Sequence, residues 1–187
     1  PIVLIAALEQ KPIDHDRLCF VQGEINEESL TRANLADAST VIVIGDDHLV
    51  ESARDAKSVL SVLTIESLNP DVYTIVELES EKNVQHCRRA NANEIIVGGT
   101  ISSTLISRAA LNHGITHVVS ELLSSQFGNE LYKTVIPQNL SGKTFLSVLT
   151  EVKEKHQSLV IAIESKEGKL LSNPAADYEV KSGDSLI

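Results

Sequence analysis

Two glutamates, Glu77 and Glu79, follow the β-branched run 72–76. Because residues i and i+2 of a strand lie on one face, the two carboxylates are expected to point the same way. Carboxylate oxygens are the ligands that calcium prefers, so the pair is a candidate divalent-cation site. A solvated acidic rim is the alternative interpretation of the same residues. A third oxygen ligand would come from one of the acidic residues earlier in the chain: Asp46, Asp47, Glu51 or Asp55.

An earlier β-branched run, 41–44, is followed by Gly45 and two of these aspartates. Between the two runs, apolar residues recur at helical spacing, and Asn69-Pro70 ends the helix because proline cannot continue it. These apolar residues are Ala56, Val59, Leu60, Leu63 and Leu68. The segment therefore predicts a βαβ unit. Ligands of open α/β sheets bind outside the carboxyl ends of the strands, so we expect a binding site where these acidic residues lie.

The remaining segments extend this unit into a doubly wound parallel α/β sheet. Strands are expected at 2–6, 18–21, 40–44, 72–76 and 92–97, with helices between most of them. The chain should then divide into three parts. We expect a Rossmann-like subdomain over 1–99, a helix-turn-helix over 100–136 and a small α+β subdomain over 137–187.

The helix-turn-helix is predicted from apolar residues at helical spacing on both sides of Gly114. Glycine supplies the left-handed conformation that often ends a helix. A helix pair of this kind cannot bury both of its faces alone, so we interpret it as a dimerisation element. A strand is expected to follow it over 127–136.

Composition excludes several classes of function. The 187 residues carry 16 basic and 26 acidic side chains, a net charge of −10 that argues against a nucleic-acid surface. No run approaches the roughly 20 apolar residues of a membrane span, so we expect no direct membrane insertion of this segment. Cys19 and Cys87 form no CxxC pair, which favours reduced cytosolic thiols. The sequence has no G-x-S-x-G elbow, and Gly114 separates His113 from His117. We therefore expect no catalytic residues.

Several motifs together resemble the RCK (regulator of potassium conductance) domain of prokaryotic potassium channels and TrkA-type transport subunits. They are Phe20-Val-Gln-Gly23 with Glu28 to Ala33, Val41 to Asp47, Glu81-Lys-Asn-Val84 with Arg88 to Ile96, Leu140 to Phe145, and Tyr178 to Leu186. The resemblance implies a non-enzymatic, ligand-sensing domain at the cytoplasmic face of the cell membrane. Such domains form homodimers that assemble into a gating ring beneath a potassium-channel pore.

The resemblance also implies ligands and their sites. Glu77-Leu78-Glu79 matches a Glu-x-Glu pair that binds calcium in some channel RCK domains, with Asp46 as the third metal ligand proposed here. NAD, ADP or ATP is the expected nucleotide. Its predicted contacts are Glu9, Gly45, Asp46, Asp47 and Asp55.

One part of the family pattern is missing from these residues. Family members begin with a strand and a G-x-G-x-x-G turn that holds a pyrophosphate, but this sequence contains no G-x-G. Residues 2–6 match the family's second strand, so we expect the first βα unit to be absent from this sequence. Two other functions stay open: a nucleotide-binding peripheral subunit of a TrkA/Ktr-type potassium transporter, and a fragment of a dehydrogenase-like enzyme.

Overall fold

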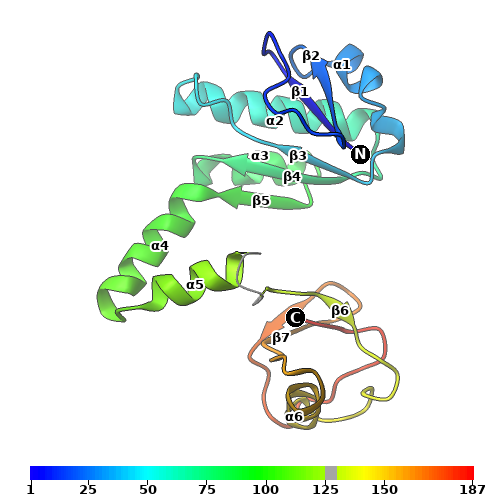
Figure 1. Ribbon diagram of the computed structural model, residues 1–187, viewed down its shortest axis with the longest axis vertical. Coiled ribbons are helices and arrows are strands. Elements are labelled where there is room, and N and C mark those ends of the chain that lie inside the picture. Colours follow the sequence, from blue (N-terminus) through cyan, green and yellow to red (C-terminus); the bar gives the residue numbers. More distant parts are fainter. Residues whose placement is uncertain (125–129) are drawn as a thin grey trace. The chain divides into compact units, whose positions relative to one another are not determined.

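The computed structural model describes residues 1–124 and 130–187 (Figure 1). The chain divides into two compact units, Pro1–Leu111 and Asn112–Ile187, and each is described by itself. In the described residues, no helix is both long and apolar enough to cross a lipid bilayer. The three-part division expected from the sequence stays a prediction.

The N-terminal unit contains two parallel sheets. Strands β1 (Ile2–Ala6) and β2 (Leu18–Gln22) pair with each other, and β3 (Thr40–Val43), β4 (Tyr73–Leu78) and β5 (Glu94–Val97) form a second sheet in that order. All of these pairs are parallel, as predicted. The expectation of one continuous sheet was wrong, because within the described residues no strand joins β1 to β3.

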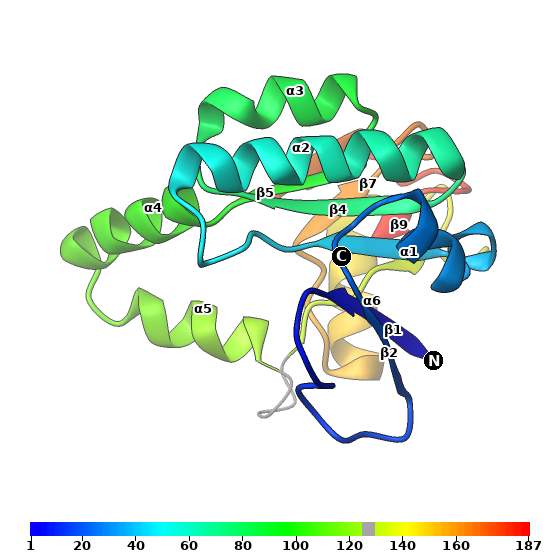
Figure 2. The ribbon, with the colours of Figure 1, turned by 90° about the horizontal axis from the view of Figure 1, so that it is seen from above.

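Helices connect these strands. They are α1 (Glu27–Arg32), α2 (Glu51–Leu68), α3 (Val84–Arg89) and α4 (Gly98–Leu111), with short 3-10 turns η1 (Leu35–Asp37) and η2 (Glu81–Asn83). Two of them, α2 and α3, lie on one side of the larger sheet (Figure 2). Helix α2 packs on β4, and α3 contacts α2 and β5 (Figure 2). α1 begins with a capping box, in which Asn26 and Ser29 each accept a hydrogen bond from the other's backbone N–H.

The predicted helix between β3 and β4 is confirmed, but its buried face differs from the expected one. Val62 and Ile65 are at most 1% exposed and join the core with Val43 and Val76. Of the apolar positions expected to mark the buried face, Leu60 is 64% exposed and Leu63 47%. Polar residues occupy buried positions on α2 instead: Asp55, Ser58 and Ser61. They place this face of the helix against the ends of the strands.

Helix α4 begins at Gly98, earlier than the sequence predicted. Glycine is tolerated there because the first N–H groups of a helix have no intrahelical partner in any case. None of the residues of α4, all of which the structure describes, is buried. Ile101 and Ile106 are 56% and 70% exposed, so the helix presents apolar side chains on its surface.

The C-terminal unit contains a four-stranded antiparallel sheet. Its elements are α5 (Ile115–Leu123), β6 (Thr134–Val135), α6 (Phe145–His156), β7 (Ala162–Glu164), β8 (Leu170–Ser172) and β9 (Ser185–Leu186), with strand order β6-β9-β7-β8. Phe145 and Val148 of α6 pack with Ile163 and Val180 in its core. The strand predicted over 127–136 is short, and its first residues, 127–129, lie outside the described ones.

The pH dependence of stability is expected to include a contribution from Glu151 on α6. Its carboxylate accepts hydrogen bonds from Lys143 (2.5 Å) and Lys155 (2.6 Å), which lower its pKa to about 2 from an ordinary 4.5. Because the folded-state pKa is lowered, this stabilisation is present above about pH 4.5 and is lost as the pH falls toward 2. Melting temperatures of Glu151→Gln should fall less steeply over this range than those of the control Glu154→Gln. Equal slopes would contradict the prediction.

Candidate functional site

A cavity of about 410 Å³ lies at the carboxyl ends of β1, β2 and β3, and we call it the strand-end cavity. Its apolar lining comes largely from the strands and includes Leu4, Ile5 and Val43, whereas its charged lining comes from the loops after them and from α2. The charged and imidazole side chains are Glu24, Asp46, His48, Arg54 and Lys57. A larger hollow on α6 is lined by one helix face only, so we place the candidate site in the N-terminal unit.

Helix α2 positions the cations of this cavity. Arg54, Lys57, Ser58 and Ser61 follow the spacing i, i+3, i+4 and i+7, which places them on one face of the helix, and all four line the cavity. This face is fixed because the neighbouring Val62 and Ile65 are buried in the core. The rotation of α2 therefore brings a guanidinium and an ammonium to the ends of the strands.

Lys57 joins two loops across the cavity. Its Nζ lies 2.6 Å from Glu24 Oε2, after β2, and 3.1 Å from Asp46 Oδ2, after β3. The hydrogen bond to Glu24 raises the pKa of Lys57, and the hydrogen bond from Lys57 lowers the pKa of Asp46. The backbone N–H of His48 also donates to Asp46 Oδ1, at 3.1 Å. Lys57 and Asp46 therefore both stay charged at neutral pH.

Arg54 is surrounded by oxygen atoms from the loops after β3 and β4. Its Nε donates to the Asp46 carbonyl oxygen at 3.1 Å, and its Nη1 lies 3.3 Å from Asp47 Oδ1 and in hydrogen-bond contact with Glu79 Oε1. Gly45 makes room for this arrangement, because a Cβ at that position would lie 2.6 Å from Arg54 Cδ. We infer that Gly45 acts through packing.

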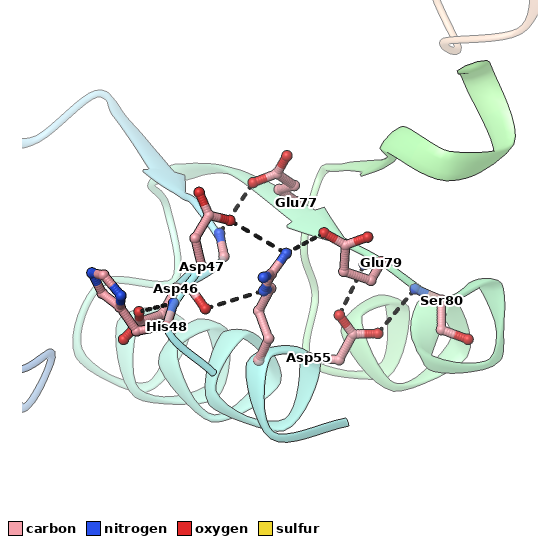
Figure 3. Close-up of polar contacts among 9 residues, drawn as sticks. Asp46, Asp47, His48, Asp55, Glu77, Glu79 and Ser80 are labelled. Atoms are coloured by element: carbon pink, nitrogen blue, oxygen red, sulfur yellow. Dashed lines mark hydrogen bonds and ion pairs between the residues drawn. The ribbon is translucent and has the colours of Figure 1, made fainter. Parts of the chain in front are cut away.

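Asp55 holds the turn between β4 and η2. It is fully buried, and its carboxylate accepts hydrogen bonds from the backbone N–H of Glu79 (2.9 Å), the backbone N–H of Ser80 (3.1 Å) and Asn83 Nδ2 (2.7 Å). Figure 3 shows this carboxylate directed at the backbone beyond β4. Asp55 does not line the cavity. Its three hydrogen bonds give Asp55 a structural role, and the nucleotide contact expected from the sequence stays a prediction.

Glu77 and Glu79 do not form an open metal site in this arrangement. Glu77 Oε2 accepts a hydrogen bond from the Gly45 N–H at 3.1 Å, and Glu79 contacts Arg54 (Figure 3). Asp46, the expected third ligand, contacts Lys57. Within residues 1–124 and 130–187, no three His, Cys, Asp or Glu side chains are grouped so that they could hold a metal ion. As arranged, these residues do not fit a divalent cation.

The structure thus brings together only some of the residues expected at the nucleotide site. Asp46 lines the strand-end cavity, whereas Glu9 lies in the exposed loop after β1 and Asp47 is 91% exposed on its side chain. Sequence reasoning missed Glu24, Arg54 and Lys57. Arg54 and Lys57 could have been recognised in the sequence, because they lie three residues apart near the start of a helix that follows a strand end.

Comparisons with known proteins match both the N-terminal unit and the whole chain. The TrkA-N domain family matches residues 7–98. The calcium-gated potassium channel TvoK of Thermoplasma volcanium is 30% identical over 191 residues, which cover 100% of this chain and 54% of TvoK. The putative potassium channel protein YugO of Bacillus subtilis is 32% identical over 177 residues, which cover 90% of this chain and 51% of YugO.

The fold is shared with a solved gating ring. The human SLO3 gating ring superposes with a TM-score of 0.78 at 17% identity, over 99% of this chain and 39% of that one. This chain spans about half the length of the curated relatives it matches. The parallel α/β architecture and the sequence match over residues 7–98 lead to one conclusion: residues 7–98 of this chain belong to the TrkA-N domain family.

Proposed function

We propose that this chain is a non-enzymatic, ligand-sensing regulatory domain that gates a potassium channel from the cytoplasmic face of the membrane. The membership of residues 7–98 in the TrkA-N family supports this, as do the two potassium-channel relatives that align with at least 90% of the chain. The observation that carries the proposal is the strand-end cavity, where three loop and helix segments bring charged groups to the carboxyl ends of parallel strands.

The proposed ligand is a nucleotide, NAD, ADP or ATP, held at the charged part of this cavity. Arg54 and Lys57 supply positive charge that can face phosphate groups, and Glu24 and Asp46 supply acceptors for ribose hydroxyls. Cavities of this size and mixed lining are typical of sites for small organic ligands.

The gap between β1 and β3 is the proposed place of one further parallel strand. Within the described residues, β1 pairs only with β2 and β3 only with β4, so their facing edges have backbone groups without a strand partner. A strand inserted there would give the continuous order β2-β1-X-β3-β4-β5. The family resemblance places its Gly-rich first βα unit at this position, which would add pyrophosphate donors to the cavity.

Gating would follow from a population shift. Lys57 already links the loop after β2 to the loop after β3, so a ligand bound between these loops can favour one arrangement of them. A ligand shifts the channel only by the difference between its affinities for the open and closed states. A bound nucleotide would therefore favour one arrangement of these charged groups over another.

Calorimetry on the natural full-length protein tests the ligand. NAD, ADP and ATP are titrated separately, and at least one should bind saturably, with one site per chain. Absence of binding for all three at millimolar concentration would overturn the nucleotide assignment.

We further propose that α4 and α5 form a homodimer interface, from which a gating ring is assembled. Exposed apolar residues on both helices support this: Ile101 and Ile106 on α4, and Val118 and Leu123 on α5, each between 56% and 72% exposed. Burying such side chains against a second copy contributes about 25 cal/mol per Å² of apolar area. The double variant Ile101→Glu/Ile106→Glu should therefore sediment as a monomer, and the matched control Ser107→Glu as a dimer. A dimeric double variant would contradict the proposed interface.

A further inference from the structure

Arg54 lies where a cation would have to lie to neutralise the carboxylates after β3 and β4. Its side chain is 19% exposed, and its guanidinium contacts Asp47, Glu79 and the Asp46 carbonyl. A guanidinium is always charged at neutral pH and presents several N–H donors in a fixed fork, so it can serve several oxygen atoms at once.

The other carboxylates of this region also have donors. Glu77 accepts from the Gly45 N–H, and Asp46 accepts from Lys57 and the His48 N–H. A calcium ion requires six to eight oxygen ligands, and it would have to take these carboxylates from their present donors. It would also lie close to the positive charge of Arg54, which repels it.

Gly45, the residue before Asp46, gives a second reason for the position of Arg54. A Cβ at position 45 would lie 2.6 Å from Arg54 Cδ and 3.0 Å from Cγ. The stem of Arg54 therefore passes directly over Gly45, and the smallest residue allows this approach. Packing as well as charge keeps the guanidinium at the ends of the two strands.

We propose that Arg54 takes the place of a divalent cation at the end of β4, so that its guanidinium pairs with the carboxylates there and this site does not bind calcium. This inference goes beyond the proposed function and does not depend on it, because it concerns calcium binding and not nucleotide binding. Arg54 is the residue that we expect to prevent calcium binding.

Calorimetry with calcium chloride on the natural full-length protein tests the inference. The wild-type chain should show no saturable binding below about 1 mM, the weak end of protein calcium affinities. Arg54→Gln should bind calcium at least about tenfold more tightly than the wild type, because the repelling charge and the competing donors are gone. Adding Glu77→Gln and Glu79→Gln to Arg54→Gln should return the isotherm to the wild-type one.

Two controls separate this effect from a change in net charge or folding. Arg32→Gln removes an exposed charge from α1 and should leave the isotherm unchanged. Arg54→Lys keeps the charge and should bind calcium as weakly as the wild type. If the wild-type chain binds calcium below about 1 mM and loses it in Glu77→Gln/Glu79→Gln, the inference is wrong. It is equally wrong if folded Arg54→Gln gains no affinity.

Discussion

Replacing Asp55 with alanine is expected to lower the free energy of unfolding by about 3–5 kcal/mol. The Asp55 carboxylate is fully buried and accepts three hydrogen bonds, from the N–H groups of Glu79 and Ser80 and from the Asn83 amide. Alanine would leave these three donors without their acceptor. Each buried donor that loses its partner costs about 1–3 kcal/mol, which makes this the largest stability effect that we expect from one substitution.

Urea denaturation followed by circular dichroism measures this change. Asp55→Asn keeps one acceptor oxygen and should fall between the wild type and Asp55→Ala. The exposed Asp71→Ala is the matched control and should stay within about 0.5 kcal/mol of the wild type. If Asp55→Ala lost less than about 1 kcal/mol, the network at the end of β4 would not have the role assigned to it.

Replacing Ala6 with phenylalanine is expected to weaken nucleotide binding at least about 100-fold. Ala6 ends β1 and lines the strand-end cavity, so a phenyl ring would occupy space that the ligand needs. Close-packed sites tolerate added volume poorly, because neighbouring side chains must leave their preferred conformations.

The matched control is Ala36→Phe, at an exposed position of η1, which adds the same ring at a residue that does not line the cavity. Calorimetry with the nucleotide that binds the wild-type protein should give unchanged affinity for this control. Nearly equal affinities of Ala6→Phe and the wild type would place the ligand elsewhere.

Strands β3, β4 and β5 could be predicted because each is a short run rich in β-branched residues that ends near glycine or polar residues. The runs 41–44 and 72–76 correspond closely to β3 and β4. Their parallel pairing followed from the helix between them. The break between β1 and β3 could not be derived from these runs, because a run of residues predicts a strand but not which other strand lies beside it.

The buried face of α2 could not be predicted from hydropathy. Leucines at positions 60 and 63 are exposed, whereas Asp55 and Ser58 are buried. The reason for this rotation lies far along the chain, since Asp55 contacts residues 24 to 28 positions later. A sequence window shows the amphipathic spacing of a helix, but not a polar contact over that separation.

The same rotation of α2 explains why Arg54 lies beside the glutamates at the end of β4. The prediction that Glu77 and Glu79 lie at a strand end holds, since β4 ends at Leu78, between them. The rule that residues i and i+2 of a strand share a face gave no information on Arg54, which contacts Glu79 from α2. In this structure Glu79 pairs with Arg54, and Glu77 accepts a hydrogen bond from the Gly45 N–H.

We propose that a nucleotide in the strand-end cavity gates potassium flow, and electrical recording tests this proposal most directly. The natural full-length protein is reconstituted in planar bilayers, and NAD, ADP and ATP are added in turn to the cytoplasmic side. We expect that the nucleotide shown by calorimetry to bind will change the potassium current. Ala6→Phe should remove this response but leave the current recorded without nucleotide. A current that no nucleotide changes, or a full response in Ala6→Phe, would contradict it.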